Sequence, residues 1–375
     1  MDHQLPDQCL ELRSTLTDDG TVTLAIRTTE VTAPGDDQVV VRIEAAPINP
    51  SDLGMLFAGG DASAGVAVGD GVAVPVTPAA LAAQAARVGR AMPTGNEGAG
   101  VVVAAGSSAA AQGLLGRVVG FLSGNAYAQY RTLHVSQCLP MADGTDPVDA
   151  AAAFVNPLTA LGMVETMRRE GHVALVHTVG ASNLGMMLNR ICLADGVPLV
   201  NIVRRPEHLA LLRDQGAEHV VDSSADSFVD DLTDALRATQ ATIAFDAIGG
   251  GELAGTLLSC MERVAGEQAG EFSRYGSDVH KQVYIYGGLD RGPTTLRRDF
   301  GMSWGIGGWL LTPFLTKIGP DDADRLRQRV ADEITTTFAS TYGMRLSLAD
   351  AVDPAHVVRY ARMATGDKAV VLPQA

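Results

Sequence analysis

From residue 154 onward, short apolar runs alternate with longer amphipathic segments, and this alternation constrains the fold more than any other feature of the sequence. The apolar runs with strand character lie at 173–179, 198–205, 219–224, 242–249 and 282–288. The segments that suit helices lie between them, at 184–195, 205–216 and 227–240. Buried strands that alternate with amphipathic helices are typical of a parallel sheet covered by helices on both faces. The pattern predicts a doubly wound α/β domain.

The first half of the chain has a different pattern. Short β-like runs alternate with Gly, Pro and Asp turns, at 21–28, 37–46, 98–106 and 116–122, which is typical of an all-β unit. Residues 344–373 predict a strand, a short helix and a last strand that returns to this unit. At 375 residues the chain is long enough for two domains. We expect a β domain over 1–153, completed by 312–375, and an α/β domain over 154–311.

An Ala-rich segment interrupts the β pattern at 77–92, within a longer insert over 61–92, and it carries Arg87 and Arg90 near its end. Its composition favours a short helix between two strands. The segment is either a surface excursion or a flap that borders a pocket.

The charge of the chain limits its partners. The formal net charge is −15, and a fold-wide negative potential repels nucleic acids and anionic membranes. No stretch approaches the roughly 20 consecutive apolar residues of a membrane-spanning helix. Residues 1–14 lack the pattern of a signal or transit peptide. These observations predict a cytoplasmic protein that binds any phosphate ligand locally.

The cysteines predict neither a disulfide framework nor a metal cluster. They are widely scattered and form no C-x-x-C pair, at Cys9, Cys138, Cys192 and Cys260. We expect them to be small buried hydrophobic residues.

The stretch TVGASNLG, at 178–185, follows the first strand of the α/β domain and opens a helix. Gly180 permits a tight turn and Gly185 permits close packing of the helix, as in turns that bind a pyrophosphate at a helix N-terminus. Ser182 replaces the middle glycine and offers a hydroxyl donor. The stretch is either such an altered turn or an ordinary connection between strand and helix.

The next strand ends in Arg204 and Arg205, where an NAD site has an acidic residue for the ribose hydroxyls. Paired guanidinium groups bind a 2′-phosphate in a bidentate manner, so this pair favours NADPH over NADH. The alternative is two solvated arginines at the start of a helix.

Several stretches, taken in order, resemble medium-chain dehydrogenases/reductases. They are INPSDLGML at 48–56, PTGNEGAGVVVAAGSS at 93–108, AAAFVNPLTALGM at 151–163, the glycine turn with 201–222, and VYIYGGL at 283–289. The resemblance covers nearly the whole chain and is strongest to the zinc-independent quinone oxidoreductase and 2-enoyl thioester reductase branch. It implies a GroES-like β domain, a Rossmann domain, NADPH, and a homodimer formed along the edge of the Rossmann sheet.

The resemblance also assigns the cofactor contacts. They would come from the turn and strand ends of the second domain and from one lysine near the chain end: Thr159, Gly180, Ala181, Ser182, Asn183, Leu184, Gly185, Arg204, Arg205, Ile248, Tyr286, Gly287, Gly288, Leu289, Trp309, Leu310 and Lys368. Trp309 with Phe314 is alternatively core or dimer packing.

No catalytic metal is expected. Zinc-dependent relatives carry Gly-His-Glu where this chain has Gly95, Asn96 and Glu97, so the histidine ligand is absent. The remaining chemistry is hydride transfer to an activated double bond, with stabilisation of an enolate and delivery of a proton. Asn49, Asn96 and Asn156 are candidate amides for such a site, and the resemblance favours Asn49 and Asn156.

The proton donor is uncertain from the sequence. Enoyl thioester reductases carry a Tyr soon after their NPSD stretch, whereas 56–65 here has Phe57 and no phenol. Tyr127, Tyr130 or water could supply the proton, or the substrate could be a quinone. The function expected first is a zinc-independent NADPH-dependent oxidoreductase that transfers hydride to a quinone, an enone or another activated double bond. The alternatives are a 2-enoyl thioester reductase and a non-catalytic NADPH-binding sensor or structural protein.

Overall fold

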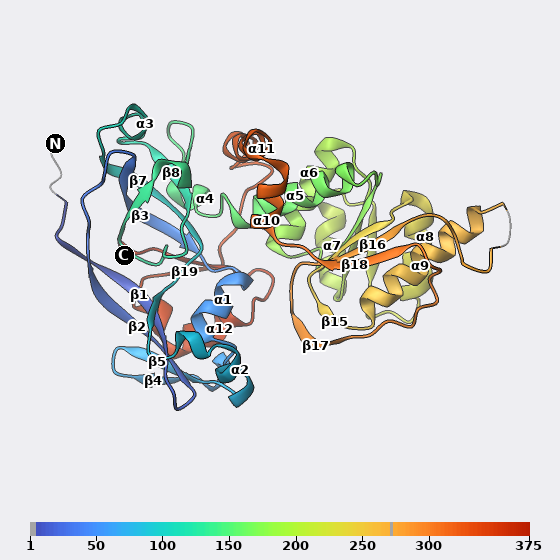
Figure 1. Cartoon of the computed structure of the whole chain (residues 1–375), viewed down its shortest axis with the longest axis horizontal. Helices are drawn as coiled ribbons and strands as arrows, with labels where there is room; N and C mark the ends of the chain where they lie inside the picture. Colours follow the sequence, from blue (N-terminus) through green and yellow to red (C-terminus); the bar gives the residue numbers. More distant parts are fainter. Residues whose placement is uncertain (1–4, 271–272) are drawn as a thin grey trace. The chain divides into compact units, whose positions relative to one another are not determined.

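A computed structural model describes residues 5–270 and 273–375, and the chain divides into two compact units (Figure 1). The first comprises Met1–Val155 and Arg327–Ala375, and the second comprises Asn156–Leu326. Residues 312–326 thus group with the second unit, whereas the sequence analysis assigns them to the first. The first four residues of the N-terminal stretch discussed above lie outside the described residues.

The first unit is built on two sheets. A five-stranded sheet has the order β4-β5-β2-β1-β6, with β4 (Val66–Val68), β5 (Gly71–Pro75), β2 (Thr21–Glu30), β1 (Gln8–Leu16) and β6 (Ala91–Pro93). A seven-stranded sheet has the order β10-β8-β7-β3-β20-β19, with β9 also paired to β3. Its strands are β10 (Cys138–Pro140), β8 (Val118–Leu122), β7 (Glu97–Ala105), β3 (Gln38–Pro47), β9 (Tyr130–His134), β20 (Ala369–Val371) and β19 (Met344–Leu346).

Short helices connect these strands. They are α1 (Pro50–Phe57), α2 (Pro78–Ala83), α3 (Ala109–Gln112), α4 (Pro147–Ala150) and α12 (Pro354–Ala361), with 3-10 turns at Ala62–Ala64, Ala85–Arg87, Val135–Gln137 and Asp350–Val352. The inward-facing side chains of both sheets form one core, which includes Leu12, Leu24, Ile43 and Phe121. Strand β20 runs antiparallel to β3, so the predicted return of the chain end to this unit is confirmed.

The Ala-rich segment forms the expected short helix, α2, followed by a 3-10 turn that ends at Arg87. The Arg87 guanidinium donates hydrogen bonds to Ser14 Oγ at 2.8 Å and to the carbonyl oxygen of Met55 at 2.9 Å. Met55 lies in the last turn of α1, where carbonyl groups lack helical partners. One arginine therefore fastens the insert to the end of α1.

The second unit is a six-stranded parallel sheet with the order β13-β12-β11-β14-β16-β18. Its strands are β11 (Leu175–Thr178), β12 (Leu199–Val203), β13 (His219–Asp222), β14 (Ile243–Asp246), β16 (Lys281–Ile285) and β18 (Trp304–Gly308). The strand order reverses between β11 and β14, as in doubly wound folds. The predicted fold class is confirmed, although β18 is not apparent as a strand in the sequence because three of its five residues are glycine.

Helices cover this sheet, and Figure 1 shows its strands flanked by α5 and α6 (green) and by α8 and α9 (yellow). The helices are α5 (Val155–Arg169), α6 (Asn183–Asp195), α7 (Pro206–Asp214), α8 (Phe228–Thr239), α9 (Leu253–Gln268), α10 (Leu311–Ile318) and α11 (Pro320–Asp332). Two further short strands, β15 (Gly249–Gly251) and β17 (Asp290–Thr294), pair outside the main sheet. Buried residues of β11, β12 and β14 pack against α8 and α9, including Val176, Ile202, Leu232 and Leu257.

The cysteines carry no disulfide, and Cys9, Cys192 and Cys260 are buried as expected, whereas Cys138 is half-buried. None of the helices in the described parts of the chain has the length and apolar character needed to cross a membrane.

Candidate functional site

The turn after β11 brings backbone segments into close contact. Val179 adopts a left-handed conformation with φ of 58°, and the chain then passes through Gly180 into α6. A Cβ added at Gly185 would lie 2.2 Å from the carbonyl oxygen of Gly180, and one added at Gly180 would lie 2.9 Å from Asn201 Oδ1. Gly185 therefore requires glycine for steric reasons, because its Cβ would meet backbone, whereas a Cβ at Gly180 would displace the Asn201 side chain.

Ser182 is the N-cap of α6, and its hydroxyl oxygen accepts the N–H of Gly185 at 3.0 Å. The Ser182 hydroxyl proton is still available to donate. The amides of Ala181 and Leu184 have no acceptor among the described residues. With the positive end of the helix dipole, these N–H groups form a site for an anion such as a pyrophosphate.

Arg204 and Arg205 follow β12, which pairs in parallel with β11, so they lie at the same sheet edge as the glycine turn. Both side chains are exposed. The Arg205 guanidinium lies 3.8 Å from Glu207, and that of Arg204 has no charged partner in the described parts of the chain. Two exposed cations beside a pyrophosphate site fit a second phosphate group.

The ends of β14 and β16 complete this edge. The N–H of Ile248 donates to the Asp246 carboxylate at 2.9 Å, which shapes the loop after β14. A Cβ added at Gly287 would lie 2.5 Å from the carbonyl oxygen of Ala247, whereas Gly288 has open space. Tyr286 precedes these glycines, and Leu289 after them is exposed.

Sequence reasoning missed His177, whose Nε2 lies 2.7 Å from the Tyr286 hydroxyl. The rings stack with centroids 5.8 Å apart, and the His177 side chain is buried. Burial lowers the pKa of His177 to about 3, so the imidazole is neutral. A single histidine inside an otherwise apolar strand was the available signal.

Other residues assigned to the cofactor lie elsewhere in the second unit. Thr159 is buried on α5. The Trp309 indole N–H donates to Thr166 Oγ1 at 3.0 Å, and its ring lies 5.3 Å from that of Phe314. These contacts favour the packing interpretation of Trp309, while Leu310 beside it is exposed.

The first unit contains a separate buried polar cluster around Asn49, the N-cap of α1. The Asn49 side-chain amide donates to Glu97 at 2.8 Å, and Glu97 also accepts the N–H groups of Phe154 and Val155 at 2.8 Å. Asp52 accepts the backbone N–H groups of Asn49 and Asn96. Burial raises the pKa of Asp52 to about 7, and it also raises the pKa of Glu97.

The side chain of Lys368 supplies the ammonium group of this cluster. Its Nζ is buried without a hydrogen-bond acceptor among the described residues and lies 5.7 Å from the centre of the Tyr342 ring. Burial lowers the pKa of Lys368 to about 8, against the opposing effect of Glu97. A buried ammonium without an acceptor fits the binding of an oxygen-rich or anionic group. Within the second unit, the glycine turn and the exposed arginines suit a phosphorylated dinucleotide.

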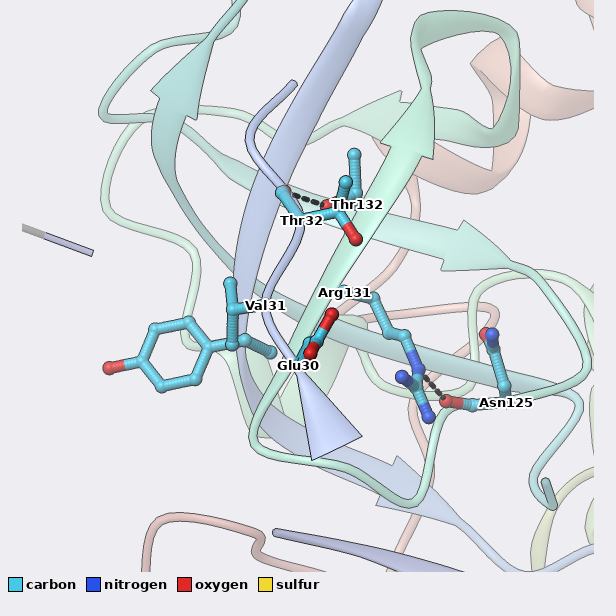
Figure 2. A pocket seen from close by; sticks show the side chains of 7 residues that line it. Glu30, Val31, Thr32, Asn125, Arg131 and Thr132 are labelled. Atoms are coloured by element: carbon cyan, nitrogen blue, oxygen red, sulfur yellow. Dashed lines mark hydrogen bonds between the residues drawn. The ribbon is translucent and has the colours of Figure 1, made fainter. Parts of the chain in front are cut away.

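The structure places one proposed proton donor, Tyr127, in the core beside Asp52 of the Asn49 cluster, and the other, Tyr130, at a pocket elsewhere in the first unit. The Tyr127 hydroxyl is buried and donates to the carbonyl oxygen of Pro47 at 3.0 Å. Tyr130 lines a shallow polar pocket, shown in Figure 2, with Glu30, Val31, Thr32, Asn125, Arg131 and Thr132. Phe57 is buried and stacks on Tyr360 with ring centroids 6.0 Å apart. Asn156 is buried on α5 in the second unit.

Comparison with known proteins agrees with this architecture. No family model matches the chain. A mitochondrial enoyl-acyl-carrier-protein reductase of Xenopus tropicalis is 28% identical over 281 residues, which are 73% of this chain and 68% of that protein. A quinone oxidoreductase of Pseudomonas aeruginosa is 27% identical over 158 residues, 41% of this chain and 48% of that protein.

Among solved structures, a candidate NADPH:quinone reductase from Mesorhizobium loti superposes with a TM-score of 0.73 at 26% identity, covering 99% of this chain and 100% of that one. These similarities agree with the parallel sheet and its glycine turn described above. In sequence the chain is similar to proteins named enoyl-acyl-carrier-protein reductase and quinone oxidoreductase, and in fold it is similar to an NADPH:quinone reductase.

Proposed function

We propose that this protein is an NADPH-dependent oxidoreductase that transfers hydride to a quinone, an enone or another activated double bond. The observation that carries the proposal is the edge of the parallel sheet, where the anion-binding turn lies beside two exposed arginines. The turn would hold the pyrophosphate, and Arg204 with Arg205 would hold the 2′-phosphate. Relatives named quinone oxidoreductase and enoyl reductase supply the substrate class.

When bound, NADPH supplies the hydride, and the chain's residues bind and orient it. The steric requirement for glycine at Gly185 and Gly287 brings backbone close to the cofactor from two strand ends. The contact of Lys368 with the cofactor, which the resemblance implies, stays a prediction. The substrate then needs only a place for negative charge on its oxygen and a source of protons.

The proposed reaction uses no catalytic zinc. Asn96 stands at the position of the zinc-binding histidine and donates its side-chain amide to Ser51 at 3.1 Å. Glu97 is occupied by Asn49 and two backbone amides. In the described parts of the chain, no group of three His, Cys, Asp or Glu side chains is arranged to hold a metal ion.

A 2-enoyl thioester reductase is the second candidate, and the naming of the Xenopus relative favours it. We also propose a homodimer formed through β18, because this strand lies at the end of the sheet with one side unpaired. Light scattering on the purified protein tests the dimer. The cytoplasmic location predicted from the sequence stays a prediction, and cell fractionation tests it.

The decisive experiment follows the loss of NADPH absorbance with matched panels of quinones, enones and enoyl-CoA thioesters, with NADH as the control cofactor. Turnover confined to quinones and enones supports the leading proposal, and preference for the thioesters supports the second. Tight NADPH binding without turnover on any panel contradicts both and favours a non-catalytic NADPH-binding protein.

A further inference from the structure

A histidine and a tyrosine form a pair at the cofactor edge of the parallel sheet. His177 lies in β11, directly before the glycine turn, and Tyr286 directly follows β16, before Gly287. Their side chains meet with Nε2 and Oη 2.7 Å apart. The pair therefore links the two loops that would lie next to the cofactor in the proposed site.

The protonation of this pair can be inferred from its surroundings. The neutral imidazole carries one N–H, and His177 Nδ1 is buried without a partner among the described residues. A proton on Nδ1 would create an enclosed donor that no ligand could reach, and buried donors without acceptors are costly. A proton on Nε2 instead donates to the Tyr286 oxygen and leaves Nδ1 as a bare acceptor. The Nε2–H tautomer is therefore favoured.

This tautomer frees the phenol proton. Because His177 donates to the Tyr286 oxygen, the Tyr286 O–H does not donate to His177 and points to another acceptor. Tyr286 as a whole is half-buried at the strand end, and burial together with the Asp246 carboxylate raises the pKa of its hydroxyl, so the phenol keeps its proton until an acceptor reaches it. Three other phenols, of Tyr127, Tyr284 and Tyr360, donate to Pro47, Glu170 and Ala351. The Tyr342 hydroxyl, in the first unit, is buried without a partner among the described residues.

We propose that Tyr286 is the proton donor of this reductase and that His177 positions its hydroxyl. The proposal rests on the proposed function. The cofactor would supply hydride for the new C–H bond, and the electron pair of the double bond would then lie on the substrate oxygen as an enolate or hydroquinone anion. The Tyr286 O–H bond breaks and its proton goes to the enolate α-carbon or the quinone oxygen. The hydrogen bond from His177 stabilises the tyrosinate, which then takes a proton from water.

Tyr286→Phe tests the proton donor, and Tyr284→Phe is the matched control. The control removes a phenol from β16 itself, one that donates to Glu170 at 2.8 Å. General acid catalysis contributes roughly 100-fold or more, so Tyr286→Phe should lower kcat by about that factor while the Kd for NADPH stays within about twofold. The control should retain its kcat. Loss of NADPH binding together with kcat, or an unchanged kcat, would overturn the assignment.

His177 is tested in the protein without cofactor. A two-bond ¹H–¹⁵N spectrum of the labelled protein, with His177→Asn identifying the signals, should show the Nε2–H tautomer. A protonated Nδ1 would contradict the proposed positioning whatever the activity. His177→Asn, which keeps an amide donor, should retain more kcat than His177→Leu, with KM little changed. Equal kcat in the two variants at equal thermal stability would reduce His177 to a packing role.

These outcomes separate the proposal from the function on which it rests. A wild-type protein without turnover on any acceptor overturns both. If the wild-type protein turns over and the Tyr286→Phe variant is unimpaired, only the assignment of Tyr286 as the proton donor is overturned. Circular dichroism of each variant identifies losses that come from misfolding.

Discussion

The side-chain amide of Asn49 donates a 2.8 Å hydrogen bond to the buried carboxylate of Glu97, which joins the entry of α1 to the start of β7. The same carboxylate accepts the N–H groups of Phe154 and Val155. Glu97→Ala leaves these donors buried without an acceptor, at about 1–3 kcal/mol each. We expect the free energy of unfolding of the first unit to fall by about 3–5 kcal/mol.

Urea unfolding followed by circular dichroism measures this loss. Glu44→Ala is the control, because Glu44 pairs with Arg42 at a partly exposed site and such pairs contribute at most about 1 kcal/mol. Similar losses in both variants would show that Glu97 does not organise the cluster.

Gly185→Ala tests the cofactor turn. The added methyl group would lie 2.2 Å from the Gly180 carbonyl oxygen, so the turn must shift away from the phosphate-binding geometry. We expect at least about a tenfold loss of NADPH affinity, measured by fluorescence titration. Gly266→Ala on α9 is the matched control, since its methyl group meets no atom within 4 Å. Alanine should stabilise that helix by up to about 1 kcal/mol and leave binding unchanged.

The second unit could be predicted from the sequence because its signals are local. Each buried strand is a short apolar run, and the glycines of the turn lie next to the strand and helix that need them. Strand β1 was missed although its burial alternates, and β18 was missed because glycine provides no apolar pattern. The role of the Ser182 oxygen as the cap of α6 was not predicted, and the expected role of the hydroxyl as a donor to the ligand stays a prediction.

The polar cluster of the first unit could not be predicted in the same way. Asn49 and Glu97 are 48 positions apart, and only the folding of the β unit brings them together. Periodicity identifies which face of a strand is buried, but it does not identify which polar side chains meet across elements. The His177 and Tyr286 pair, 109 positions apart, has the same origin.

Arg204 and Arg205 should decide the choice between the two nicotinamide cofactors. Hydrogen bonds to charged groups contribute about 1.5–3 kcal/mol each, so replacing both residues with Ala should weaken NADPH binding by a few kcal/mol and spare NADH. Arg213→Ala on α7 controls for the loss of a nearby positive charge. Calorimetric titration with both nucleotides measures the effect, and equal losses for NADPH and NADH would contradict the 2′-phosphate assignment.

Asp52 should make the stability of the protein fall as the pH rises from about 4 to 7. Burial raises the pKa of this carboxyl from 3.8 to about 7, so between these values the folded protein holds a proton that the unfolded chain has released. Stability from this group is therefore present at low pH and is lost as the pH approaches the folded pKa. The slope approaches about 1.4 kcal/mol per pH unit within that window. Urea unfolding of the wild type and of Asp52→Asn at pH 4.5, 5.5 and 6.5 measures this effect. The variant lacks the titrating carboxyl but changes the cap of α1 at every pH, so the informative quantity is how the difference in free energy of unfolding between wild type and variant changes with pH. The variant should become more stable relative to the wild type at each step. A constant difference would mean that Asp52 is ionised throughout, held by the backbone amides of Asn49 and Asn96.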